Sequence, residues 1–295
     1  MTRAHRHWGR SALVLAAFSF GWAALLVVIG VVSVAGPLWA LVEQGVPVTE
    51  LGERFQALIE GPEGVSVTAT TLAIQFPLML ALAEGVRRMT WWVVWEQAPP
   101  VAPMREGYAW HGWGGWKVIA VAVVAGATTG WAPGWVAGRL REAFPAFDLG
   151  GVAMVNEALS AGTTGQVAAV VGAVVVGAPV VEELVFRGML WDAFSRTLAP
   201  WATWLVVSVV FSAYHMDPFQ ALPLLFTAGV IGWFRLRTAS VLPGMVVHFV
   251  NNALGLGIAA SGVVDAELPL WGVILSALVA VGACASLPMR TTAVA

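Results

Sequence analysis

The stretch Gln166–Trp191, QVAAVVGAVVVGAPVVEELVFRGMLW, decides the fold because a long apolar run carries charged residues within it. A helix needs about 20 mostly apolar residues to cross the hydrocarbon core of a bilayer. This run is interrupted by Pro179, by the adjacent acids Glu182 and Glu183, and by Arg187. Ionisable side chains inside a bilayer are energetically expensive and by default mark a functional site. The stretch therefore predicts a membrane helix that carries part of such a site.

The whole chain has the composition of a membrane protein. Of its 295 residues, 59% are hydrophobic and 11% are charged, whereas a soluble chain carries about 25% charged residues. Long apolar runs lie near 12–35, 66–86, 117–137, 167 onward, 201–216, 219–234, 240–260 and 268–288. The strands of a membrane barrel would be short and alternating instead. We therefore expect an all-α, polytopic membrane bundle of about eight transmembrane helices.

The basic residues set the expected orientation, because Lys and Arg are enriched in cytoplasmic loops. With the N-terminus in the cytoplasm, twelve of the 15 basic residues lie inside, and Arg54, Arg139 and Arg141 lie outside. An even number of spans also places the C-terminus in the cytoplasm. The first apolar run exceeds the hydrophobic region of a usual signal peptide, so we expect it to be retained as a span. The lysine-poor, Ala/Val/Gly/Trp-rich composition favours a bacterial plasma membrane.

The connections and the remaining composition complete the expected organisation. Residues 36–65 and 138–165 are expected outside, and the tryptophan-rich stretch 87–116 at the inner interface, where tryptophan anchors helices. We expect one integrated membrane domain in three parts: N-terminal helices and interfacial loops (1–160), a catalytic core (161–265), and a last helix with a short cytoplasmic tail (266–295). The single cysteine, Cys284, excludes an intramolecular disulfide and is expected to be an inert packing residue. Net charge is −2, and one basic residue is a lysine, so nucleic acid is not an expected partner.

The charged residues of the deciding stretch separate into an ion pair and a free acid. Glu183 and Arg187 are four residues apart, with the acid N-terminal to the base, which is the favoured order for an ion pair on a helix. Glu182 lies about 100° around the helix from Glu183, so the two acids cannot serve Arg187 equally. We expect Glu182 to face a cavity. Pro179, one turn earlier, frees a backbone carbonyl, which a membrane helix tolerates where a neighbour or water compensates.

Two later runs carry histidine at compatible depths. His248 precedes Asn252 by four residues, so both side chains can point at one place. Glu182 lies 17 residues before Ala199 and His215 lies 16 after it, which gives both nearly the same height in a helical hairpin. His248 lies near the middle of its own run. One glutamate, two histidines and one asparagine can therefore meet inside the membrane.

These groups fit the hydrolysis of an amide or ester. A glutamate and an imidazole can activate water, while a second imidazole and an amide can donate to a developing oxyanion. Glu182, His215 and His248 are alternatively candidate zinc ligands with an open fourth position, although the HExxH spacing is absent. Helix packing is a simpler interpretation of each residue alone. A proton-coupled transporter is a further alternative, although no repeat pairs the two halves of the chain.

Three motifs in this order resemble those of the intramembrane CAAX-prenyl-protease and bacteriocin-processing (CPBP, Abi) family. They are Glu182-Glu183-x-x-x-Arg187, Phe211-x-x-x-His215 and His248-x-x-x-Asn252, all within about residues 165–260. The resemblance implies an eight-helix membrane endopeptidase. In that family the residues matching Glu182 and His215 are thought to activate water, and those matching His248 and Asn252 to form the oxyanion hole.

The resemblance also implies supporting residues and a class of substrate, and it leaves the cofactor open. Glu183, Arg187 and Phe211 would support the site, and the substrate would be a peptide or protein in or at the membrane. The family is often labelled metalloprotease, yet a glutamate mechanism without a metal is also proposed for it, so zinc is an open cofactor. Other members are thought to act as scaffolds or immunity proteins, which makes a non-catalytic role the alternative function.

Overall fold

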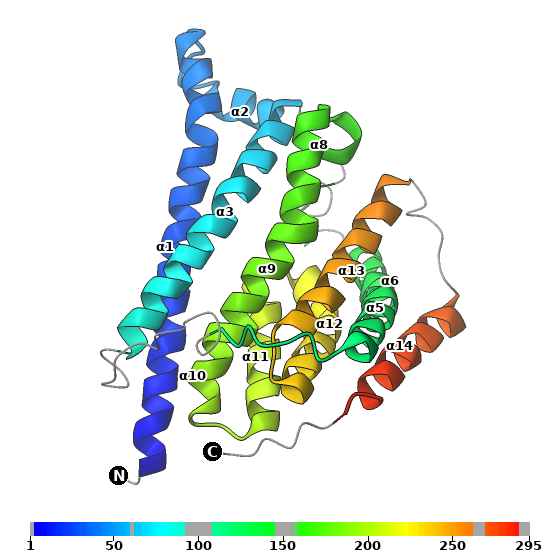
Figure 1. Cartoon of the computed structure of the whole chain (residues 1–295). Helices are drawn as coiled ribbons and strands as arrows, with labels where there is room; N and C mark the ends of the chain where they lie inside the picture. The colour runs from blue at the N-terminus through cyan, green and yellow to red at the C-terminus, as the bar shows by residue number, and fades with distance from the viewer. Residues whose placement is uncertain are drawn as a thin grey trace.

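The computed structural model describes residues 3–59, 62–91, 108–144, 155, 158–261 and 269–288. Within these residues the regular elements are helices and no strand is present (Figure 1). They are α1 (Arg3–Glu43), α2 (Leu51–Ile59), α3 (Pro62–Met89), α5 (Trp116–Thr129), α6 (Trp131–Ala143), α8 (Thr164–Val171), η3 (Gly172–Gly177), α9 (Ala178–Glu182), η4 (Glu183–Leu190), α10 (Trp191–Ser195), α11 (Pro200–Tyr214), α12 (Pro218–Thr238), α13 (Leu242–Ala260) and α14 (Leu270–Ala285). The described part contains six segments long and apolar enough to cross a membrane and two shorter apolar helices, α11 and α14. The predicted all-α membrane bundle is confirmed, and the chain is an integral membrane protein.

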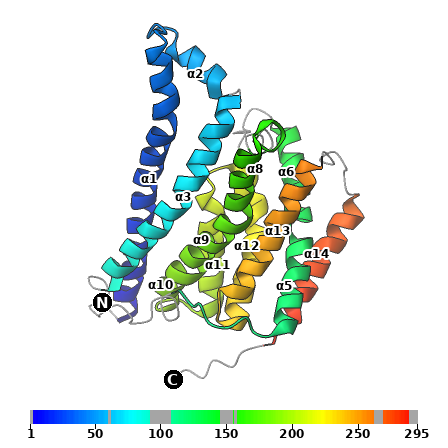
Figure 2. The ribbon, with the colours of Figure 1, turned by 45° about the horizontal axis from the view of Figure 1, so that its top comes forward.

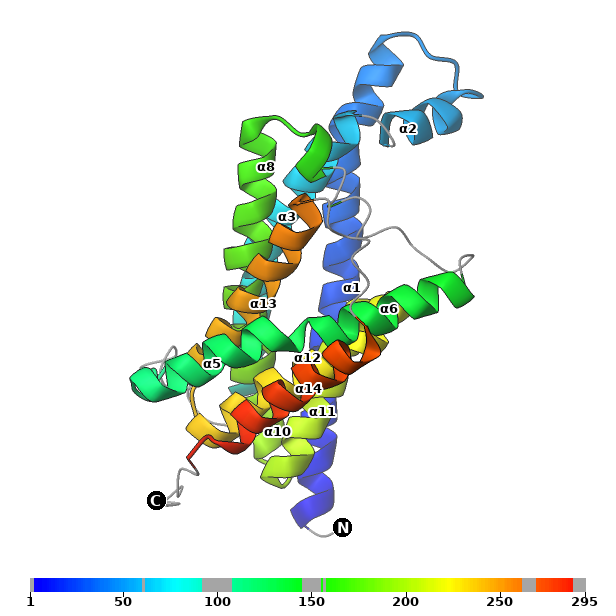
Figure 3. The same ribbon diagram turned by 90° about the vertical axis from the view of Figure 1, so that its right-hand side faces the viewer.

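The continuous rod from α8 to α10 stands at the centre of the molecule. Figures 1 and 2 show α1 and α3 as a long hairpin on one side of this rod, with α13, α5, α6 and α14 on the other. Figure 3 shows α5 and α6 end to end, crossing obliquely over α12 and α13. Both helices contact α12, and α5 also contacts α13. In Figure 1, α1 begins and α14 ends toward the same end of the molecule, as an even number of spans requires. Which side of the membrane this end faces stays a prediction.

The connections differ in part from the sequence prediction. The expected outer loop 36–65 is largely helical, because α1 continues to Glu43 and the amphipathic α2 precedes α3. The charged residues Asp148 and Glu157 of the other expected outer connection lie outside the described residues, as do Trp92 and Trp95 of the tryptophan-rich stretch.

Helix α11 is shorter than the span expected near 201–216. Its 15 residues correspond to about 22 Å, less than the roughly 30 Å of a hydrocarbon core. The helix ends because Met216 adopts a left-handed backbone with φ 53°. Asp217 then caps α12 by accepting a hydrogen bond from the Phe219 N–H at 2.8 Å, and Pro218 begins that helix. His215 consequently lies at the C-terminal cap of α11 rather than inside a helix.

The central rod contains two π-helical segments, η3 and η4. Such segments are rare and are often found at functional sites. At the end of η3 the Ala178 N–H donates to the Ala173 carbonyl, five residues earlier. By the same count the next carbonyl, that of Val174, would pair with Pro179, which has no N–H. The backbone therefore changes register immediately before the two glutamates.

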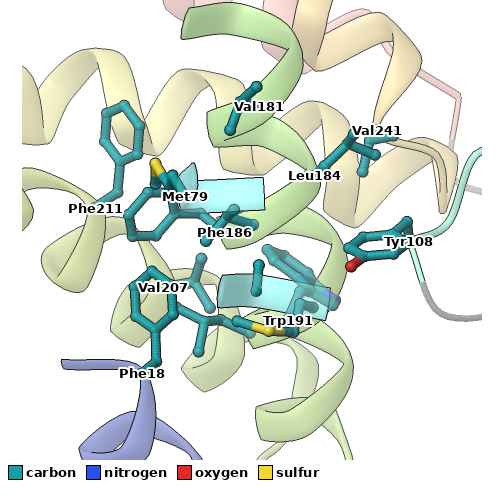
Figure 4. Close-up of a cluster of buried hydrophobic side chains, with 14 of the residues drawn as sticks. Phe18, Met79, Tyr108, Val181, Leu184, Phe186, Trp191, Val207, Phe211 and Val241 are labelled. Atoms are coloured by element: carbon teal, nitrogen blue, oxygen red, sulfur yellow. The ribbon is translucent and has the colours of Figure 1, made fainter. Parts of the chain in front are cut away.

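An aromatic core joins the N-terminal hairpin to the central rod. Phe186 of η4 is fully buried. Its ring packs edge-on against Phe18 of α1 and Phe211 of α11, with centroid distances of 6.2 and 5.1 Å (Figure 4). It also packs edge-on against Tyr214 of α11, at a centroid distance of 5.2 Å. Each such pair contributes about 0.5–1.5 kcal/mol beyond the area that it buries. The core thus fixes α1 beside the segment that carries the glutamates, and Met79 of α3 belongs to the same core.

Tyr108 belongs to the same core. Its backbone packs so closely on Gly188 that a Cβ built there would lie 3.1 Å from the Tyr108 Cα. The Tyr108 hydroxyl donates to Glu84 Oε2 at 2.8 Å, and burial is the main cause that raises the pKa of Tyr108. The neighbouring Ala109 carbonyl accepts a hydrogen bond from the Val241 N–H at 3.1 Å. This segment therefore links α3, η4 and the start of α13.

Gly126 tests the close packing of α5 on α13. A Cβ at this position would lie 2.6 Å from the Val247 carbonyl oxygen and 2.8 Å from the Val250 Cβ. We expect Gly126→Ala to lower the free energy of unfolding by about 1–3 kcal/mol, because the helices would have to move apart. The measurement is the thermal unfolding midpoint of the purified protein in detergent.

Gly134→Ala in α6 is the matched control, since nothing lies within 4 Å of a Cβ built there. Its midpoint should stay unchanged or rise slightly, because alanine favours a helix over glycine. Equal midpoints for the two variants would contradict the close approach of α5 and α13.

Candidate active site

A cavity of about 540 Å³ lies among the central helices and is lined by residues of α1, α3, η3, α9, α11, α12 and α13. The four predicted catalytic residues all line it: Glu182, His215, His248 and Asn252. Its volume falls in the range of small-ligand sites, about 300–1,000 Å³. Residues from three separate apolar runs therefore share one cavity. Their catalytic roles stay a prediction.

Glu183 and Arg187 form an ion pair beneath the cavity. Arg187 Nη1 donates to Glu183 Oε1 at 3.0 Å, and both side chains have 0% exposure. Arg187 Nη2 donates to the Ala228 carbonyl of α12 at 3.1 Å, and the guanidinium lies 4.2 Å from the centre of the Phe211 ring. Neither member of the pair lines the cavity. The pair holds η4 against α11 and α12, which is a supporting position.

His248 lies between the two glutamates. Its Nδ1 is 3.3 Å from Glu183 Oε1, and a carboxylate accepts, so this contact places a proton on Nδ1. Its Nε2 is 3.9 Å from Glu182 Oε2, which is too long for a hydrogen bond. Nε2 and the Glu182 carboxylate are therefore both available to a third group in the cavity.

His215 has one ring nitrogen engaged and one available. Its Nδ1 lies 3.1 Å from the Phe211 carbonyl oxygen. A carbonyl can only accept, so Nδ1 carries the proton and Nε2 remains an acceptor. The Phe211 ring packs edge-on against both His215 and His248, with centroid distances of 5.1 and 6.0 Å. Phe211 thereby orients the two imidazoles.

Asn252 takes the carbonyl that Pro179 leaves without a helical partner. Asn252 Nδ2 donates to the Val174 carbonyl at 2.9 Å, which links α13 to η3. Asn251 Nδ2 lies 3.3 Å from Asn252 Oδ1 and donates to it. The amide of Asn252 is therefore held at both ends, with one N–H left over.

The N-terminal hairpin supplies a wall of the cavity that the motif analysis missed. This wall consists of Trp22 and Leu26 from α1, and Leu72, Gln75 and Phe76 from α3. The sequence held one signal for it, because Gln75 is a polar side chain in the middle of an apolar run. Nothing in the sequence placed that run beside the three motifs.

Comparison with known families identifies the segment that holds the motifs. Residues 164–254 match the family model described as type II CAAX prenyl endopeptidase Rce1-like. We call these residues, which resemble that family, the Rce1-like segment. The resemblance stated from the three motifs is confirmed, and this family is one of membrane endopeptidases. No curated protein and no solved structure matches the chain.

The candidate zinc ligands Glu182, His215 and His248 line the same cavity of the Rce1-like segment. Among the described residues, no group of three or more His, Cys, Asp and Glu side chains is placed so that it could hold a metal ion. Nδ1 of His215 is engaged by the Phe211 carbonyl and Nδ1 of His248 faces Glu183, so Nε2 is the atom of each ring that is left for a ligand. A bound metal stays a prediction.

Removing one member of the buried ion pair should destabilise the Rce1-like segment strongly. We expect Arg187→Met to lower the free energy of unfolding by about 3–5 kcal/mol, because Glu183 would be left buried without its cationic partner. The double variant Glu183→Gln/Arg187→Met should recover part of this loss. Thermal unfolding in detergent measures both effects.

Arg88→Met is the control, because Arg88 pairs with Glu84 while 68% exposed. Its effect should be no more than about 1 kcal/mol. A similar small effect of Arg187→Met would contradict the supporting role of the pair.

The hydrogen bond from Asn252 to the Val174 carbonyl can be tested with a double-mutant cycle that combines substitutions of Asn252 and Pro179. We expect Asn252→Ala to lower the free energy of unfolding by about 0.5–1.5 kcal/mol, because the part-buried Val174 carbonyl loses its hydrogen bond. The loss should be smaller in a Pro179→Ala background, where residue 179 gains an N–H. Unfolding midpoints of the four proteins give the coupling free energy. Equal losses in both backgrounds would contradict the view that Pro179 frees this carbonyl.

Proposed function

We propose that the protein is an intramembrane endopeptidase that hydrolyses a peptide bond with water activated by Glu182 and His215. One observation carries the proposal: Glu182, His215, His248 and Asn252 line a single cavity although they come from three separate helical segments. Residues 164–254 match a family of endopeptidases, which supports a peptide as the substrate.

Water activation uses the two groups whose acceptor atoms are available. The Glu182 carboxylate takes a proton from water while His215 Nε2 accepts the other O–H hydrogen bond. The water oxygen then attacks the carbonyl carbon of the scissile peptide bond. Glu182 holds the proton until the C–N bond breaks and then passes it to the leaving amine nitrogen. The products are a carboxylic acid terminus and an amine terminus.

The oxyanion is stabilised by His248 and Asn252. Because the Glu183 contact holds a proton on His248 Nδ1, an Nε2 donor requires the doubly protonated ring. Asn252 contributes the N–H that Val174 does not use. Fixed donors of this kind stabilise charge that develops in the transition state.

The substrate is proposed to be a peptide or protein in or at the membrane. The family description names CAAX prenyl endopeptidases, and a prenylated C-terminus is one candidate. The lysine-poor composition favours a bacterial membrane, so other membrane peptides belong in the same test.

A non-catalytic scaffold or immunity protein is the second candidate. It is favoured by the structural hydrogen bonds that engage two site residues, His248 with Glu183 and Asn252 with Val174. In that function these residues would serve only to pack α13 on the central rod.

Cleavage of a quenched peptide library, with and without prenylated cysteine, distinguishes the two candidates. We expect the purified protein in detergent to cleave some members, and Glu182→Gln to slow cleavage by about 10²- to 10⁴-fold, because the general base is lost. Glu142→Gln is the control, since Glu142 is exposed on α6, and it should retain full activity.

Each other result has a defined meaning. Full activity of Glu182→Gln would overturn the proposed mechanism. No cleavage by the wild type, together with an unchanged cellular phenotype of Glu182→Gln, would favour the scaffold. Activity lost with a chelator and restored by zinc would assign a metal to the reaction.

A further inference from the structure

Gln75 is a polar side chain that the Rce1-like segment does not supply. It lies midway along α3, outside residues 164–254, and faces the same cavity as Glu182 and the two histidines. Its neighbours on this wall, Leu72 and Phe76, are apolar. An amide in the middle of a membrane helix requires a partner, because lipid offers none.

The hydrogen bonds around Gln75 leave its oxygen unused. Gln75 Nε2 donates to the Tyr214 hydroxyl at 3.4 Å, and that hydroxyl donates to Met79 Sδ at 3.2 Å. Since the hydroxyl proton points to Met79, Tyr214 can only accept from Gln75. Gln75 Oε1 therefore faces away from Tyr214 and has no hydrogen bond within the described part of the chain. Gln75 lines the same cavity as His215, the proposed water-activating group.

The other amides of the cavity lie on α12 and α13. Gln220 Nε2 donates at 3.0 Å to Asp217, the cap of α12, so its Oε1 is an acceptor on the α12 side of the cavity. Asn252 holds the Val174 carbonyl, and Asn251 Oδ1 is buried without surface in the cavity. Gln75 is thus the amide on the α3 wall that can accept from a bound molecule.

A peptide that is cleaved within this cavity needs hydrogen-bond acceptors for its backbone. The scissile bond must be in an extended segment to be reached, so the adjacent backbone N–H groups lose their helical partners. An unpaired N–H in an apolar environment is costly. A neutral amide oxygen satisfies it without introducing another charge beside Glu182.

We propose that Gln75 Oε1 accepts a hydrogen bond from a backbone N–H next to the scissile bond and so holds the substrate extended between α3 and Glu182. The inference rests on the proposed peptidase function and makes α3 part of the substrate site. Gln75 is then a substrate-binding residue that contacts the backbone of the peptide and not a side chain of it.

An ester scan tests this contact. The probe is the library peptide cleaved fastest by the wild type, with analogues in which one backbone N–H at a time is replaced by an ester oxygen. For the wild type we expect one analogue near the cleaved bond to lose about tenfold in kcat/KM, as for a lost hydrogen bond that leaves its partner buried. Gln75→Leu should lose a similar factor on the all-amide peptide and show no further loss on that analogue.

Leu72→Met is the matched control, because it changes the same wall without changing its hydrogen bonds. It should keep the wild-type response to every ester. An unchanged kcat/KM for Gln75→Leu, or an ester response equal to that of the wild type at every position, would overturn the proposal.

Binding separates this proposal from the peptidase proposal. The labelled peptide and its ester analogue are titrated into Glu182→Gln and into Glu182→Gln/Gln75→Leu. If no peptide is cleaved, the library peptide that binds Glu182→Gln most tightly is used, and its ester analogues are scanned by binding. An ester effect on Kd that disappears with Gln75→Leu supports the contact even without cleavage. An ester effect of equal size in both proteins, or no effect in either, overturns it.

Discussion

The ion pair between Glu183 and Arg187 is the interaction on which the rest of the site depends. Two fully buried charges within a membrane protein gain their further partners from neighbouring helices, because lipid cannot supply any. Arg187 therefore binds the Ala228 carbonyl of α12 and lies over Phe211 of α11, while Glu183 contacts His248 of α13. One pair thus fixes three helices around the central rod, and the Phe211 carbonyl in turn engages His215.

The π-helical backbone of the central rod also helps to position the residues of the site. Non-helical backbone is tolerated at membrane depth where protein or a cavity surrounds it. Here the π-helical η3 and Pro179 leave the Val174 carbonyl without a helical N–H, and Asn252 takes it. The unpaired carbonyl therefore orients one of the proposed oxyanion donors. This is a physical reason for the irregular segments to flank Glu182.

The features that the sequence predicts are those that depend on local spacing. Apolar length predicts the membrane helices, and the four-residue step predicts the pairing of Glu183 with Arg187, because both follow from helix geometry alone. The short α11 was also readable, since Asp217 and Pro218 form a helix start. The Val174–Asn252 bond was not readable, because it requires the π-helical register of η3. The place of Gln75 depends on the packing of α3 against η3, α9 and η4, which no spacing within α3 can indicate.

The charges around the cavity are arranged so that the reaction need not change their sum. Glu183 is paired with Arg187, so the carboxylate of Glu182 is the charge that the proposed reaction moves. When Glu182 takes the proton of water, its negative charge passes to the oxyanion, which faces His248. Charge then moves within the cluster and no net charge is created in a region of low dielectric constant, where an uncompensated ion is strongly unfavourable. A neutral Gln75 on the opposite wall keeps that balance, whereas a charged residue there would disturb it.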